Sequence, residues 1–120
     1  MPDLVAFEIL IPLTDNFTGS LHQPQKFLDW VKAAVGKFGG MTTLGLALEG
    51  HWYDRDLPPS ANPVVDHCNW YKIGIPEGRI DELRAFTEET ARLFGQKCIY
   101  FERAGEADFV WDSAHKPAKG

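Results

Sequence analysis

The chain has 120 residues, of which 44% are hydrophobic and 24% are charged, and these proportions are ordinary for a globular protein. This length suits one domain with a substantial core and leaves no room for a second domain. The formal net charge is -5, and the lysines and arginines are scattered along the chain. This pattern argues against nucleic acid binding, which needs clustered basic side chains for phosphate contacts.

The N-terminal residues and the two cysteines indicate where the protein works. Residues 1–3 include no basic side chain, and the apolar run at 9–11 is interrupted by Pro12 and is far too short to span a bilayer. Cys68 and Cys98 form neither a CxxC pair nor a cysteine-rich framework. We therefore expect a cytoplasmic protein with no membrane partner. The sequence leaves open whether the two cysteines are free thiols.

Hydrophobic patterns predict three elements in the first half of the chain. Alternating apolar side chains predict a strand over residues 4–13. Apolar residues spaced i, i+3, i+4 and i+7 predict a helix over 23–38. A second alternating stretch predicts a long strand over 41–53. On that strand, the side chains expected to face the core are Leu44, Leu46, Leu48 and Trp52.

The second half of the chain predicts a loop and three further elements. Three prolines make residues 54–65 a surface loop, and residues 67–75 are the strand that returns from it. A helical apolar stripe follows over 76–94, and a short strand over 98–102. Residues 107–111 are apolar enough for a short edge strand or for a segment packed on the sheet.

The order strand, helix, strand, strand, helix, strand is typical of one fold class. It predicts an α+β domain with the ferredoxin-like βαββαβ arrangement, in which two helices cover one face of a four-stranded antiparallel sheet. We place this domain, with its C-terminal extension, at residues 1–112. Residues 113–120 are polar and lack an apolar period, so we expect a loose tail there.

The predicted sheet has one face without helices, and large aromatic side chains lie among charged ones on that face. Such a face usually contacts a partner subunit, a terminal segment or a ligand. We expect a small molecule to bind there, next to the loop at residues 54–66. The candidate binding residues are Glu8, Glu49, His51, Tyr53, His67, Trp70, Lys72, Tyr100 and Glu102.

The residues near this face suggest three kinds of chemistry. Imidazole and carboxylate groups of His51, Asp54, Asp66 and His67 suit a metal or general base catalysis, but no HxH, HExxH or CxxC spacing supports them, and we assign no metal. Cys68 as a nucleophile needs an activating neighbour, and His67 next to it on a strand points to the opposite face. Glutamates of the open face paired with a histidine or lysine are more typical of cross-strand ion pairs. The catalytic residues and any cofactor stay unidentified.

Three short motifs mark the start and the end of the long strand predicted at residues 41–53. They are the helix end Phe38-Gly39-Gly40, the strand start Met41-Thr42-Thr43 and the strand end Gly50-His51-Trp52. They resemble those of a family of small bacterial proteins of unknown function with the ferredoxin-like fold. Members of this superfamily often dimerise through the open sheet face into an α/β barrel around a small-molecule pocket. The resemblance implies this fold and no particular activity, and we expect a homodimer and a small-molecule ligand.

Two functions remain open from the sequence. In one, the open face and the adjacent loop bind a small molecule, with or without catalysis. In the other, the protein is a non-catalytic interaction or assembly domain, and the same aromatic side chains are buried in a protein interface. A pocket requires an unfilled cavity on the open face, whereas an interface requires those side chains to pack against another chain.

Overall fold

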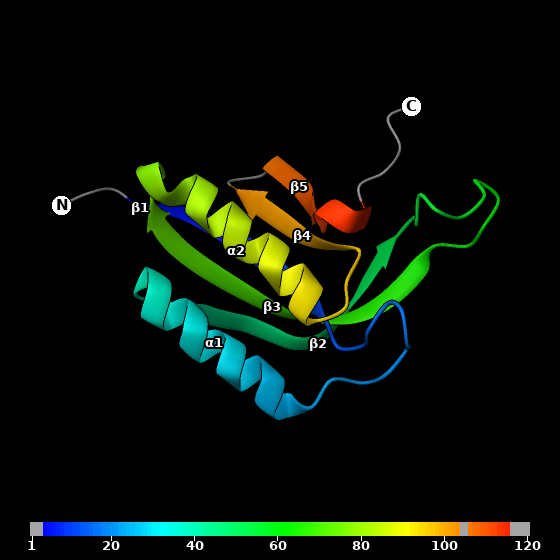
Figure 1. The fold of residues 1–120 in the computed structure, drawn as a ribbon, viewed down its shortest axis with the longest axis horizontal. Coiled ribbons are helices and arrows are strands. Elements are labelled where there is room, and N and C mark those ends of the chain that lie inside the picture. Colours follow the sequence, from blue (N-terminus) through cyan, green and yellow to red (C-terminus); the bar gives the residue numbers. More distant parts are fainter. Residues whose placement is uncertain (1–3, 104–105, 116–120) are drawn as a thin grey trace.

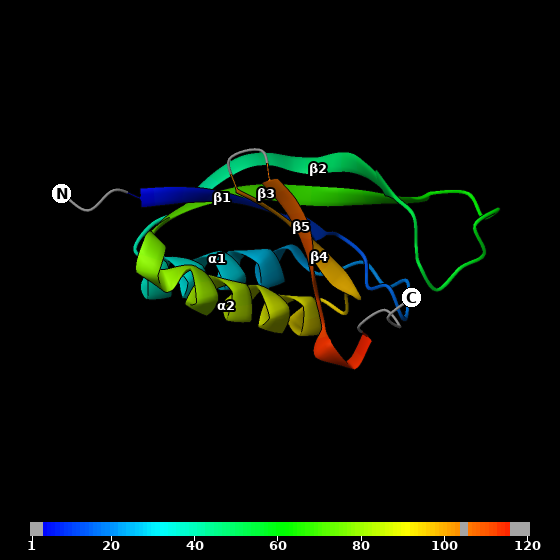
Figure 2. The same cartoon turned by 90° about the horizontal axis from the view of Figure 1, so that it is seen from above.

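The computed structural model, which describes residues 4–103 and 106–115, contains one antiparallel sheet with two helices across one of its faces (Figures 1 and 2). The strands are β1 (Leu4–Pro12), β2 (Thr42–Trp52), β3 (Val64–Pro76), β4 (Cys98–Arg103) and β5 (Glu106–Trp111). The helices are α1 (Pro24–Phe38) and α2 (Ile80–Leu93), and short 3-10 turns lie at Glu77–Arg79 and Ser113–His115. No helix in the described part of the chain has the length and apolar character needed to cross a membrane.

The predicted four-stranded ferredoxin-like sheet is wrong, because the described residues form five paired strands in the order β2-β3-β1-β4-β5. The fifth strand pairs with β4 from Cys98↔Trp111 to Arg103↔Glu106. The segment predicted as an extension is therefore a sheet edge, and it satisfies backbone groups of β4 that would otherwise be unpaired. The predicted tail at 113–120 begins with the 3-10 turn, and residues 116–120 lie outside the described residues.

The two helices form where the sequence predicts them, and each has an identifiable reason to begin or end. Pro24 lies in the first turn of α1, where its missing N–H has no intrahelical partner to lose. Gly39 ends α1 with φ 95°, and its N–H donates to the carbonyl of Val35. The helices are joined by a buried hydrogen bond of 2.8 Å from Trp30 Nε1 to Thr90 Oγ1.

The core lies between the helices and one face of the sheet. Its centre is β1, where Phe7, Ile9 and Ile11 are no more than 2% exposed. Their strand partners continue the same layer, because Phe7 lies opposite Ile73 and Ile9 lies opposite both Tyr71 and Phe101. The other buried apolar side chains of this cluster are Phe27, Trp30, Phe38, Ile75, Leu83, Ala91, Phe94, Ile99 and Val110.

The side chains of β2 do not follow the predicted alternation. Leu44, Leu46 and Leu48, predicted to face the core, are 41%, 66% and 40% exposed. The pairing with β3 shifts register twice, between Thr43 and Gly45 and between Gly45 and Leu48. Each shift inserts an extra residue into β2, so a simple period of two cannot apply along the strand.

The second bulge is held by a side chain of the neighbouring strand. Ala47 has a left-handed backbone, with φ 53°, which is unfavourable for a residue with a Cβ. Its N–H donates to Asn69 Oδ1 at 3.1 Å, and Asn69 Nδ2 in turn donates to the hydroxyl of Tyr71 at 3.2 Å. The bulge is therefore tied to the buried face of β3.

The burial of α2 makes a matched pair of leucines a test of this packing. Leu83 is fully buried, whereas Leu93 on the same helix is 54% exposed. We expect Leu83→Ala to lower the free energy of unfolding by about 2–5 kcal/mol, because it leaves a cavity in the core. Leu93→Ala should change it by less than about 0.5 kcal/mol. Urea denaturation followed by circular dichroism measures both, and equal losses would contradict the orientation of α2.

Candidate functional site

A cavity of about 250 Å³ opens on the sheet face that the helices leave uncovered. Strand register explains why its floor forms there. Leu10 lies opposite Trp70 on one side of β1 and opposite Tyr100 on the other, and Pro12 lies opposite Cys68. These residues have the opposite parity to the core residues of the same strands. The cavity is lined by Leu10, Pro12, Gly50, His51, Trp52, Asp66, Cys68, Gln96, Cys98 and Tyr100.

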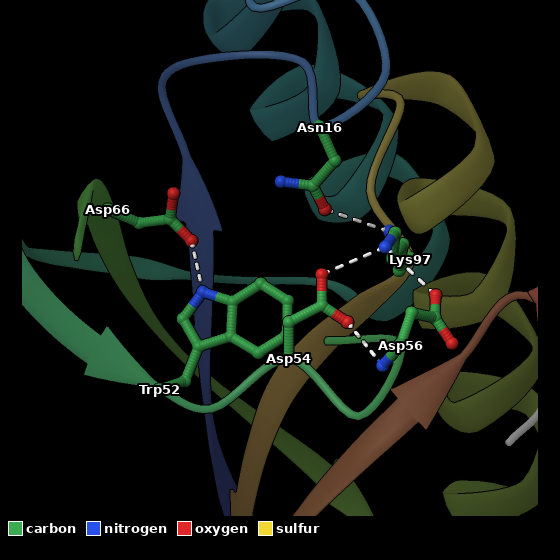
Figure 3. Close-up of polar contacts among 6 residues, drawn as sticks. All are labelled: Asn16, Trp52, Asp54, Asp56, Asp66 and Lys97. Atoms are coloured by element: carbon green, nitrogen blue, oxygen red, sulfur yellow. Dashed lines mark hydrogen bonds and ion pairs between the residues drawn. The ribbon is translucent and has the colours of Figure 1, made fainter. Parts of the chain in front are cut away.

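One buried carboxylate forms part of this mostly apolar wall. Asp66 is 8% exposed, and its Oδ2 accepts a hydrogen bond of 2.6 Å from Trp52 Nε1 (Figure 3). Because a carboxylate can accept about four hydrogen bonds, Asp66 keeps acceptor capacity beyond this indole N–H. The pair comes from adjacent strands, since Trp52 ends β2 and Asp66 lies near the start of β3. The cavity therefore combines an aromatic wall with one negative hydrogen-bond acceptor.

Both cysteines are free, and both line the cavity. Burial, with the negative charge of Asp66 adding to it, raises the pKa of the Cys68 thiol to about 12. Burial, with the charge of Asp54 adding to it, also raises the pKa of Cys98 to about 12. At neutral pH these groups are protonated thiols, which are poor nucleophiles. They act here as small, polarizable apolar groups of the wall.

A lysine next to the cavity forms ion pairs with the long loop between β2 and β3. Lys97 Nζ lies 2.8 Å from Asp54 Oδ2 and 2.9 Å from Asp56 Oδ2 (Figure 3). The backbone N–H of Lys97 donates to Asn16 Oδ1 at 3.0 Å. Lys97 follows Gln96 and precedes Cys98, which both line the cavity. The cluster therefore connects the loop, the start of β4 and the segment after β1 at one end of the cavity.

This cluster sets the protonation of its members. Burial raises the pKa of Asp54, but the hydrogen bonds from Lys97 and from the Asp56 N–H, together with the charge of Lys97, outweigh it and lower the pKa below the usual value. The hydrogen bonds to Asp54 and Asp56 raise the pKa of Lys97. Asp54 and Lys97 are therefore both ionised near neutral pH.

The structure brings some of the sequence-predicted binding residues together on the open face. Glu8 lies opposite Lys72 on β3 and opposite Glu102 on β4, next to the row that contains Trp70 and Tyr100. The hydroxyl of Tyr100 donates to Glu102 Oε2 at 3.2 Å, and burial and this carboxylate raise the tyrosine pKa. Of these five residues, Tyr100 lines the cavity.

Other predicted residues are arranged differently. Glu49 lies opposite His67, and by strand parity these two side chains are on the same side of the sheet as Tyr71, which is the helix side. His51 Nε2 lies 2.8 Å from Glu49 Oε1, although His51 also lines the cavity. Tyr53 is 71% exposed and lies outside the cavity. The binding role of all nine residues stays a prediction.

Several lining residues were missed or misplaced by the sequence patterns. Trp52 was predicted to face the core, yet it lies on the open face because Gly50 and Trp52 pair with Asp66 and Val64. Cys98 shares the parity of Tyr100, and this alternation is a signal that could have placed it on the open face. Gln96 and Lys97 precede β4 and carry no periodic signal. Within residues 4–103 and 106–115, no group of three or more metal-ligating side chains is placed to hold an ion.

The indole of Trp70 differs from that of Trp52. In the described part of the chain, Trp70 Nε1 is a buried donor without a hydrogen-bond partner. A buried unpaired donor costs about 1–3 kcal/mol, so such groups are rare in folded proteins. Trp70 is next to Leu10, a cavity residue, on the open face.

The chain is similar in fold to a solved structure. No protein-family model matches the chain, and no curated protein matches it. Among solved structures, a phage SAM lyase in complex with S-methyl-5'-thioadenosine is similar, with a TM-score of 0.61, 12% sequence identity, and 92% of each chain covered. At this identity the likeness shows a shared fold alone. The resemblance to small bacterial proteins stays a prediction.

The two partly buried indoles of the open face make a matched test of the Asp66 contact. Trp52→Phe removes the donor that Asp66 receives at 2.6 Å and leaves a buried carboxylate short of a partner. Trp70→Phe removes a donor that has no partner. We expect Trp52→Phe to lower the free energy of unfolding by about 1–3 kcal/mol more than Trp70→Phe does, as measured by urea denaturation. A smaller effect at Trp52 would contradict the contact.

The lysine cluster predicts a dependence of stability on pH. Since the pKa of Asp54 is lower folded than unfolded, its ionised form stabilises the fold above about pH 4. This contribution disappears as the pH falls through the lowered pKa. We expect Lys97→Met to lower the free energy of unfolding by about 1–2 kcal/mol at pH 7. The difference from the unaltered protein should shrink in acid.

Urea denaturation at a series of pH values measures this effect. Lys32→Met, which removes an exposed lysine from α1, is the matched control and should change the free energy by less than about 0.5 kcal/mol. A Lys97→Met loss that is independent of pH would show that Asp54 and Lys97 are not coupled.

Proposed function

We propose that this protein binds a small molecule of nucleoside type in the open-face cavity, and S-methyl-5'-thioadenosine is the first ligand to test. The observation behind this proposal is a cavity with an aromatic wall and one carboxylate in a fold similar to that of a SAM lyase bound to S-methyl-5'-thioadenosine. The cavity of about 250 Å³ is slightly below the range of about 300–1,000 Å³ typical of ligand pockets. Its occupant is therefore a small metabolite.

The lining chemistry favours a flat heteroaromatic group with hydrogen-bond donors. The rings of Trp52 and Tyr100 provide apolar surface for such a group. Asp66 provides an acceptor for an amino or hydroxyl group, and a hydrogen bond to its charged oxygen is stronger than a neutral one. The protonated thiols of Cys68 and Cys98 suit a polarizable group such as a thioether.

The charge of the lining predicts which nucleosides are excluded. Among the described residues that line the cavity, Asp66 is the one acidic side chain, and none is a lysine or an arginine. A phosphate group placed in this cavity would face the Asp66 carboxylate, and Lys97, which lies next to the cavity, is already paired with Asp54 and Asp56. The site therefore favours a neutral or positively charged nucleoside over a nucleotide. The thiols, being protonated, offer no activated nucleophile, so the proposal is binding rather than a specific reaction.

Isothermal titration calorimetry with S-methyl-5'-thioadenosine, and with adenosine monophosphate as the anionic comparison, tests the proposal. We expect the thioadenosine to bind and the monophosphate to bind at least about tenfold more weakly. Asp66→Asn keeps an oxygen acceptor for Trp52 but removes the charge. This variant should bind S-methyl-5'-thioadenosine about tenfold more weakly than the unaltered protein does.

The matched control is Asp81→Asn, which removes an exposed carboxylate from α2 and should leave binding unchanged. Absence of thioadenosine binding at millimolar concentration would overturn the nucleoside assignment. Equal binding of the monophosphate, or an Asp66→Asn variant that binds like the unaltered protein, would place the ligand outside the cavity. The assembly hypothesis would then be favoured for this face.

A further inference from the structure

Gln96 is a buried polar side chain in the wall of the cavity. It is 1% exposed, and it lies shortly before β4. Its Nε2 donates to the main-chain carbonyl of Thr14 at 2.6 Å and to that of Phe94 at 2.8 Å. Because a side-chain amide has two N–H donors, both donors of Gln96 are taken by the protein. The group that this side chain can offer to a ligand is therefore its oxygen, Oε1, which is a hydrogen-bond acceptor.

Strand register places this amide at the same end of the cavity as the Asp66 carboxylate. β1 and β3 are paired as far as Pro12, which lies opposite Cys68. A main-chain hydrogen bond of 2.7 Å continues this antiparallel pairing one residue further, so Thr14 follows beside Asp66. Gln96 reaches the same Thr14 from the β4 side of β1. Asp66 and Gln96 therefore lie on either side of Thr14, and both line the cavity.

The other polar side chains of the lining direct their hydrogens to acceptors of the protein. The indole N–H of Trp52 donates to Asp66 at 2.6 Å, and the hydroxyl of Tyr100 donates to Glu102 at 3.2 Å. The Nε2 atom of His51 lies 2.8 Å from a glutamate of the same strand. The two protonated thiols are weak donors. The described side chains of the lining therefore offer a ligand mainly acceptors, and a ligand that fits them must supply the donors.

We propose that Gln96 Oε1, together with Asp66, receives an exocyclic amino group of the ligand's base and makes the cavity specific for amino-bearing bases over oxo-bearing ones. This inference rests on the nucleoside proposed for the cavity. An amino group has two hydrogens, one for each acceptor, whereas a carbonyl in its place leaves both acceptors without a donor. Gln96 cannot adapt by turning its amide over, because Oε1 would then face the carbonyls of Thr14 and Phe94 and both hydrogen bonds would be lost.

Calorimetric titration with S-methyl-5'-thioadenosine and with S-methyl-5'-thioinosine tests the proposal, because these ligands share the sugar and the thioether and differ at the base edge. The unaltered protein should bind the thioinosine at least about tenfold more weakly than the thioadenosine. Gln96→Leu removes the acceptor and should lower the ratio of the two dissociation constants at least about threefold. Gln25→Leu, which changes an exposed glutamine of α1, is the matched control and should leave the ratio unchanged.

The ligand pair separates this inference from the nucleoside proposal on which it rests. Binding of neither ligand at millimolar concentration would overturn both. Equal binding of the two ligands would overturn the role of the amino group and leave the nucleoside proposal standing. A ratio that Gln96→Leu leaves unchanged, in a variant that circular dichroism shows to be folded, would overturn the role of Gln96. If Gln96→Leu does not fold, the ratio measured on the unaltered protein decides.

Discussion

The two-sided pairing of β1 is the constraint on which the core and the cavity both depend. β1 is hydrogen-bonded to β3 on one side and to β4 on the other, so its alternation determines the faces of three strands together. Phe7, Ile9 and Ile11 point to the helices, and the residues between them point to the open face. Because the side-chain period is two, a slip of one residue in either pairing would expose the core row and bury Glu8. The same register places Leu10 and Pro12 under the cavity. The hydrophobic requirement of the core is therefore what positions the open-face residues.

The parts of the fold predicted correctly from the sequence are those whose patterns are local and regular. Both helices, β1 and β3 have continuous apolar periods, and these periods report burial directly. The prediction failed at β2, where the alternation of leucines is real but does not indicate the core. The strand has two bulges, and the second, with the left-handed Ala47, is stabilised by Asn69, which is distant in sequence, so no local pattern indicates it. The fifth strand was recognised only as an optional edge, since a short strand becomes part of a sheet through its partner rather than through its own sequence.

The sequence predicted which face of the sheet carries the candidate site, but it did not predict which side chains meet there. Strand parity correctly placed Tyr100 on the open face, and Glu8, Lys72 and Glu102 form a row there. Parity could not identify Trp52 and Asp66 as partners, because their contact depends on the register beyond the second bulge. The contacts of Lys97 could not be predicted from the sequence, for a different reason. Its partners Asp54 and Asp56 are more than forty residues away and belong to a loop, where hydrophobic periodicity has no meaning. Long-range polar contacts of this kind can be obtained only from the folded chain.

The features that cost stability are concentrated on one part of the molecule. The unpartnered indole of Trp70, the left-handed Ala47, the exposed leucines of β2 and the open-face cavity all involve β2, β3 or the sheet face opposite the helices. The core between the helices and the sheet shows the opposite character, because its clustered apolar side chains are no more than 7% exposed and a buried hydrogen bond joins α1 to α2. Local departures from favourable structure persist in natural proteins where the rest of the fold enforces them, and they cluster at functional surfaces. The helix side of this chain therefore holds the well-packed core, and the β2–β3 side, with the open face, holds the cavity for which we propose a ligand.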